Sequence, residues 1–167
     1  DGLSLPVEIP IVTVCAAGKT SQIAADLLAA QGRQVFSLAG GMKAWSLAWN
    51  SAHVSVQDQA VQVIQVRRTG KGCLSYLIGD GTSAIVIDAS LAPQVYLDLV
   101  EQQGWQITSV LDTHIHADHL SRSRQLAEQC GATLFFPEQH RISFPATIMH
   151  DRDTLDTGTM RITAIHT

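Results

Sequence analysis

The chain contains the stretch Thr113-His114-Ile115-His116-Ala117-Asp118-His119, which places four potential metal ligands within six positions. It directly follows an apolar run at 109–111, which is typical of a buried strand. Side chains two positions apart on an extended backbone project to the same side. His114 and His116 are therefore expected to converge on one ion.

Asp118 and His119 follow where the chain should leave that strand, and they are expected to hold a second ion or to support the first. A single histidine is usually a surface group or a hydrogen-bonded core group. Burying this many polar rings without partners would be costly, whereas metal ligands cluster on short loops. The motif therefore predicts a metal centre, and the residue types alone leave the identity of the metal open.

Composition places the 167 residues among ordinary globular proteins, with 46% hydrophobic and 16% charged side chains. The net charge is −4 and no block of like charge is present, which argues against a nucleic acid partner. No apolar stretch approaches the length needed to cross a bilayer, so no membrane segment is expected.

Three widely spaced cysteines are present, at positions 15, 73 and 130, and none belongs to a CxxC pair. An odd number leaves at least one thiol free, which favours a reducing, cytoplasmic compartment over a disulfide framework. Cys73 and Cys130 are expected to be packing residues, because neither precedes a predicted helix or has a neighbouring base.

The pattern of apolar residues divides the chain into a first segment at 1–50, a linker at 51–60 and a second segment at 61–167. The first segment is predicted to run strand, helix, strand and short helix, at 11–14, 22–31, 35–38 and 42–49. This order favours a parallel crossover unit.

The second segment carries more strands than helices. Strands are predicted at 61–66, 73–78, 84–88, 109–111, 133–136 and 160–165. Helices are predicted at 91–103 and 121–130, and each is followed by a glycine that can end it.

Cys15 lies in a loop between a buried strand and a predicted helix N-terminus. Inward-pointing backbone N–H groups, the helix dipole and the nearby Lys19 would all lower the pKa of its thiol. A stabilised thiolate is a good nucleophile and can carry an extra sulfur as a persulfide. The alternative is a small buried hydrophobe, which is how most free cysteines behave.

The motif His114-x-His116-x-Asp118-His119 resembles the signature of the metallo-β-lactamase superfamily. Its fuller form, residues 112–119, looks most like the persulfide dioxygenase branch and is also similar to glyoxalase II. The resemblance implies that His114, His116, Asp118 and His119 form the metal site and that Asp118 is catalytic. In the dioxygenases the resemblance implies Fe(II), with His116 as the iron ligand of the motif and the other three residues orienting ligands and bound water. In the hydrolases it implies one or two Zn ions, with His114 and His116 on the first ion and Asp118 and His119 on the second.

The pattern Cys15-x-x-Gly18-x-x-Ser21, followed by Gly40-Gly41 and Trp45, resembles the C-terminal half of a rhodanese domain. In that family the cysteine accepts the transferred sulfur, which would make Cys15 catalytic. Thr20 stands where a basic residue is often found. The implied fold is therefore mixed α/β and α+β: a partial rhodanese-like parallel unit, then the N-terminal half of a metallo-β-lactamase αββα sandwich. The chain is expected to be cut at both ends, with further metal ligands beyond Thr167.

Together, the two resemblances imply a sulfur-metabolism enzyme that oxidises a thiol persulfide, such as glutathione persulfide, with O₂ to give sulfite. One alternative is a zinc hydrolase of the glyoxalase II or thioesterase kind. Another is a non-catalytic sulfur carrier or scaffold. Half of a rhodanese sheet would leave apolar faces uncovered, so a homo-oligomer is also possible.

Overall fold

The computed structural model describes residue 6 and residues 8–58, 60–139 and 141–167, which include most of both predicted segments. The chain divides into two compact units, residues 1–48 with 69–71 and residues 49–68 with 72–167. Each unit is described separately below.

The first unit is a small parallel crossover. Its elements are β1 (Ile11–Thr13), α1 (Lys19–Ala29), β2 (Val35–Ser37) and α2 (Gly41–Trp45). Strands β1 and β2 pair in parallel, with Ile11 opposite Val35, so the predicted strand–helix–strand unit is confirmed. Helix α1 begins at Lys19, three residues before the predicted start, because Gly18 ends the preceding loop with a φ of 82°.

The second unit is built on one mixed seven-stranded sheet in the order β3-β4-β5-β6-β7-β8-β9. The strands are β3 (Asn50–Val54), β4 (Val61–Arg68), β5 (Cys73–Asp80), β6 (Ser83–Ile87), β7 (Gln106–Leu111), β8 (Thr133–Pro137) and β9 (Thr147–Met149). Neighbouring strands are antiparallel from β3 to β6 and parallel from β6 to β9. A separate antiparallel hairpin follows, made of β10 (Thr154–Thr157) and β11 (Met160–Thr163).

Strand β3 corrects the predicted linker. Residues 51–54 were expected to connect two segments, but they pair antiparallel with β4, with His53 opposite Ile64. All five β3 residues are exposed, which explains why the sequence shows no apolar alternation there. An edge strand that buries neither face is held by backbone hydrogen bonds, and these leave no pattern in the side chains.

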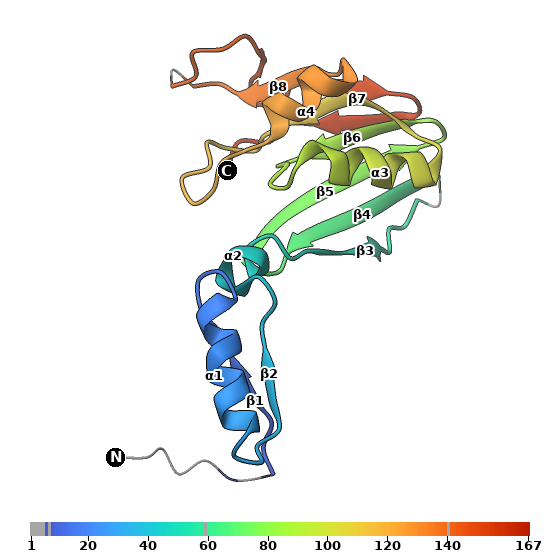
Figure 1. The fold of residues 1–167 in the computed structure, drawn as a ribbon. Coiled ribbons are helices and arrows are strands. Elements are labelled where there is room, and N and C mark those ends of the chain that lie inside the picture. Colours follow the sequence, from blue (N-terminus) through green and yellow to red (C-terminus); the bar gives the residue numbers. More distant parts are fainter. Residues whose placement is uncertain (1–5, 7, 59, 140) are drawn as a thin grey trace. The chain divides into compact units, whose positions relative to one another are not determined.

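Helices α3 (Pro93–Gln103) and α4 (Ser123–Cys130) lie on the same face of this sheet (Figure 1). Their apolar sides pack with inward-facing sheet residues into one core, in which Val66, Leu77 and Tyr96 are fully buried. Both helices end at a glycine in the left-handed region, as the sequence predicts. None of the helices in the described ranges is long and apolar enough to cross a membrane.

Gly79, a buried residue of β5, gives a stability prediction. A Cβ atom added there would lie 2.4 Å from the indole ring of Trp105, which is itself buried. We expect Gly79→Ala to lower the free energy of unfolding by about 1–3 kcal/mol, because the ring cannot move without disturbing the core. Chemical denaturation should show a lower midpoint. Gly72→Ala is the control: its Cβ would meet open space, so it should cost only the strain of a φ of 81°.

Candidate metal centre and candidate thiol site

The histidine-rich motif lies in a loop at the carboxyl end of β7. The strand ends at Leu111, so the expectation that His114 and His116 share an extended strand is wrong. The two rings nevertheless lie together, with centroids 4.2 Å apart. Their convergence therefore comes from the loop and from residues that hold it.

Asp88 is the main residue that holds this loop. It directly follows β6, and because β6 and β7 run parallel, the carboxyl ends of both strands meet at one edge of the sheet. The carboxylate accepts hydrogen bonds of 2.7 Å from the backbone N–H and from the hydroxyl of Thr113, and lies 3.1 Å from Nε2 of His116. Asp88 has a φ of 54°, a conformation that is costly outside glycine and is kept here by these contacts.

Asp88, His114 and His116 form the first cluster, in which one ligand atom from each residue lies within 4.8 Å of the other two. The Thr113 hydroxyl lies 2.9 Å from Nδ1 of His114 and leaves its Nε2 available to an ion. Two imidazoles and a carboxylate are a donor set that non-haem iron sites use, and zinc accepts it as well. The cluster therefore fits a metal ion.

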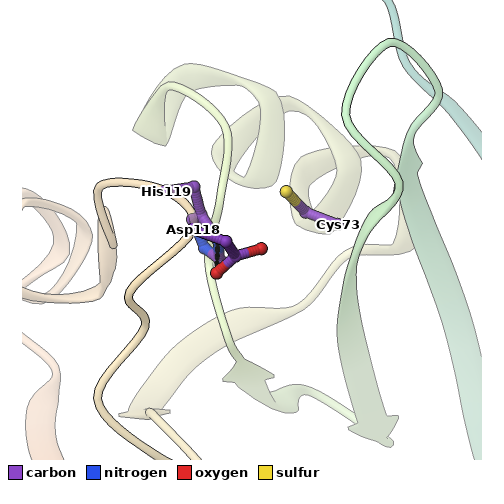
Figure 2. Close-up of side chains that lie close together, drawn as sticks. All are labelled: Cys73, Asp118 and His119. Carbon is purple, nitrogen blue, oxygen red and sulfur yellow. Dashed lines mark hydrogen bonds and ion pairs between the residues drawn. The ribbon is translucent and has the colours of Figure 1, made fainter.

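Cys73, Asp118 and His119 form the second cluster, with ligand atoms again within 4.8 Å of one another. Figure 2 shows the Cys73 thiol from the start of β5 facing the two residues of the motif loop. The ring of His119 lies 4.3 Å from that of His116, centroid to centroid, so the two clusters are neighbours. Cys73 is buried, as expected of a packing residue, and it also lies against the motif loop.

Asp118 is the exposed member of the second cluster, with 71% of its side chain accessible. Its own backbone N–H and the ring of His119, at 3.1 Å, lower the pKa of its carboxyl group. The side chain is therefore an anion at neutral pH, as a metal ligand must be.

Asp112 anchors the base of the loop. It is buried, and burial raises the pKa of its carboxyl group, while the hydroxyls of Ser123 and Ser121 oppose that shift by donating to its two oxygens. Arg122 adds a backbone bond of 2.7 Å to the carbonyl of Ala89. The two ends of the loop are thus tied to each other and to the residue next to Asp88.

A cavity of about 890 Å³ opens beside the motif at the carboxyl edge of the sheet. Its lining includes Thr113 and His114 of the motif loop together with Phe135, Glu138 and His150. The size suits a small organic substrate, and the mixture of apolar walls with a few polar groups is typical of ligand pockets.

Cys15 lies in the first unit, in the loop between β1 and α1. Its sulfur accepts a hydrogen bond of 3.1 Å from the backbone N–H of Gly18. The hydroxyls of Ser21 and Thr20 and the Ser21 backbone lower the pKa of the thiol to about 6. Ser37 donates to the Ser21 oxygen, so the Ser21 proton remains available to the sulfur. The backbone N–H groups of the loop contribute as the sequence analysis expects, and the hydroxyls of Ser21 and Thr20 act in place of Lys19 and the helix dipole.

The shifted pKa of Cys15 predicts a pH profile. Alkylation by iodoacetamide, followed by mass spectrometry of the Cys15 peptide, should be half-maximal near pH 6 and lose rate below it, because only the thiolate reacts. Ser21→Ala should move the midpoint upward, toward the ordinary value of 9.0. Cys130 in the same sample provides the reference thiol. A midpoint for Cys15 that Ser21→Ala leaves unchanged would contradict the assigned cause.

Comparison with known proteins identifies both parts of the chain. Residues 68–160 match the family model of the metallo-beta-lactamase superfamily, and residues 3–48 match the model of the rhodanese-like domain. The chain belongs to the metallo-beta-lactamase superfamily and carries a rhodanese-like domain before it. The mixed α/β fold predicted from the two resemblances is confirmed.

The curated relatives that the chain matches include hydroxyacylglutathione hydrolases. The enzyme of Rhizobium meliloti is 39% identical over 49 residues, covering 29% of this chain and 19% of the relative. That of Methylobacillus flagellatus is 31% identical over 81 residues, covering 48% of this chain and 32% of the relative. The chain thus spans a third or less of the length of these relatives.

Solved structures agree with the assignment to the metallo-beta-lactamase superfamily. ETHE1 from Myxococcus xanthus superposes with a TM-score of 0.51 at 32% identity, over 58% of this chain and 44% of that one. The metallo-beta-lactamase BJP-1 of Bradyrhizobium japonicum gives 0.51 at 21% identity, over 74% and 54% of the two chains, which shows a shared fold alone. The glyoxalase II and ETHE1 branch is thus the part of the superfamily that the chain resembles.

Proposed function

We propose that the second unit contributes the metal centre of a thiol persulfide dioxygenase. The first cluster carries this proposal, because Asp88, His114 and His116 offer two imidazoles and one carboxylate at one point. Fe(II) held by such a set keeps open positions at which O₂ and substrate can meet. The likeness to ETHE1 and the resemblance of residues 112–119 to persulfide dioxygenases support the same reaction.

The residues around the cluster would hold the substrate and orient the ligands. Thr113 and Asp88 fix the two rings, and such outer contacts keep a ligand in its productive orientation. The adjoining cavity has room for a small thiol persulfide such as glutathione persulfide. Asp118, ionised and exposed, is proposed as the catalytic residue that positions a proton or a bound water.

Oxygen uptake tests this proposal. The protein that carries this chain, loaded anaerobically with Fe(II), should consume O₂ on addition of glutathione persulfide and release sulfite. A zinc-loaded sample of the same protein is the matched control and should consume none. Absence of O₂ uptake in a sample shown to contain iron would remove the dioxygenase proposal.

A zinc hydrolase of glutathione thioesters is the second candidate. The curated relatives are hydroxyacylglutathione hydrolases, and the second cluster lies next to the first, as a two-metal site would require. Bound zinc would lower the pKa of a water molecule and supply the nucleophile. Hydrolysis of a hydroxyacylglutathione by the zinc-loaded protein, with no O₂ consumed, would favour this function.

Cys15 is proposed as a sulfur acceptor in the rhodanese-like domain. Its thiolate would attack the outer sulfur of a donor R–S–S⁻, forming the Cys15 persulfide while the donor's S–S bond breaks and RS⁻ leaves. Cyanolysis after loading with thiosulfate or a persulfide should release thiocyanate from the unaltered protein and none from Cys15→Ser. Equal release from both proteins would remove this role.

The setting proposed for these reactions is the reducing cytoplasm. All three cysteines, Cys15, Cys73 and Cys130, are unpaired thiols. A persulfide acceptor needs a reduced thiol, and an Fe(II) centre needs reduced iron. A reducing compartment keeps both in that state.

A further inference from the structure

We infer that Cys73 is a metal ligand, and that Cys73, Asp118 and His119 form a thiolate-containing site for a soft divalent cation, with Zn²⁺ as the expected occupant. This inference deepens the proposed function and rests on it, because two of the three ligands belong to the same motif loop as the first cluster. It adds a residue that the sequence motif does not contain.

The first argument is the state of His119. Its side chain is only 5% exposed, and its Nε2 has no hydrogen-bond partner among the described residues. A buried ring nitrogen that lacks a hydrogen-bond partner destabilises the fold. Nδ1 faces Oδ1 of Asp118 at 3.1 Å, so Nε2 is left with an unshared lone pair. A cation supplies the missing partner.

The second argument is the position of Cys73. The residue is 8% exposed at the first position of β5, and it is more than 40 residues from the motif in sequence. Figure 2 nevertheless shows its sulfur directed toward Asp118. Its sulfur and the Asp118 carboxylate are thus close enough to ligate one cation, which would also offset the repulsion between a thiolate and a carboxylate.

Charge and chemistry then select the ion. On binding, the thiol of Cys73 loses its proton to solvent, so one thiolate, one carboxylate and a neutral imidazole balance a divalent cation. This neutral complex tolerates burial. Thiolate ligands favour Zn²⁺ over hard cations such as Mg²⁺, and three protein ligands leave a fourth position for water.

The geometry permits this complex. Ligand atoms around a tetrahedral zinc lie about 3.5 Å apart, given bonds of about 2.0–2.3 Å. One potential ligand atom from each of the three residues lies within 4.8 Å of those from the other two. Asp118 is 71% exposed, so its side chain can rotate inward and also leaves a route by which the ion enters.

Cobalt substitution tests the assignment. Cys15 and Cys130 are changed to serine, which leaves Cys73 as the single thiol of the chain. Anaerobic titration of this protein with Co²⁺ should produce the thiolate-to-cobalt charge-transfer absorption in the near ultraviolet. Adding Cys73→Ser should remove that band, and Asp118→Asn should weaken Co²⁺ binding at least about 10-fold.

The outcomes separate the inference from the proposed function. No substrate and no O₂ are present, so the band reports only on Cys73. A protein that saturates with Co²⁺ and shows no such band overturns the inference, even if it is active. A band that Cys73→Ser removes supports the inference, even if neither O₂ uptake nor hydrolysis is found. Asp118→Asn alters an exposed side chain, so its effect cannot be ascribed to misfolding.

Discussion

His114→Ala should remove the metal ion from the first cluster and lower turnover by at least about 100-fold. Mutating residues that only hydrogen-bond to a metal ligand typically lowers activity by about 10- to 100-fold, and losing a ligand should cost at least as much. The reason is that Nδ1 of this ring faces the Thr113 hydroxyl, so Nε2 is the atom offered to the ion. His114 is exposed, and its loss should leave the unfolding temperature of the metal-free protein nearly unchanged. Metal content by mass spectrometry and turnover should fall together.

His53→Ala provides the matched control, because His53 is an exposed histidine of the same unit and lies on the edge strand β3. This variant should keep both the metal and the activity. His114→Ala protein that retains a full equivalent of metal at the first cluster would contradict the ligand assignment. A loss of turnover with the metal retained would instead place His114 in substrate binding.

Asp88→Ala should damage both stability and metal binding. The carboxylate receives two hydrogen bonds from Thr113 and contacts His116, so its removal should lower the free energy of unfolding by about 2 kcal/mol. Alanine must also adopt a φ of 54° at this position. Asp88→Gly loses the same contacts without that strain, and should be more stable than Asp88→Ala by about 1 kcal/mol.

Metal affinity should separate the two roles of Asp88. Both variants lack the carboxylate of the first cluster, so both should bind the ion at least about 10-fold more weakly, although their stabilities differ. Asp98→Ala, a change on the exposed face of α3, should alter neither quantity by a measurable amount. Unaltered affinity in Asp88→Gly would show that Asp88 only supports the loop.

Elements with a buried face could be predicted from the sequence. Strands β4 and β5 alternate between buried and accessible residues, and glycines mark the ends of α3 and α4. Strand β3 was missed because it buries neither face, and β9 and β10, which bury at most one residue each, were missed as well. Patterns of polarity report burial, and these strands bury little.

The candidate metal site could be predicted only in part, because some of its residues lie far from the histidine motif in sequence. The motif identifies His114, His116, Asp118 and His119, whereas Asp88 and Cys73 come from distant strands. Asp88 directly follows an apolar run, and that local sequence does not mark it as a ligand. Nothing near Cys73 in the sequence signals a ligand, because Asp118 and His119, its neighbours in space, come from the distant motif loop.

The parallel pairing of β6 with β7 has a consequence for how the protein folds. Asp88 and His116, 28 positions apart, meet only after helix α3 has crossed back and both strands have paired. Closing such long crossovers is slow, and the unfolded chain holds no preformed coordination shell. The metal ion should therefore bind only the folded unit. Its binding should raise the melting temperature in proportion to the logarithm of the free metal concentration.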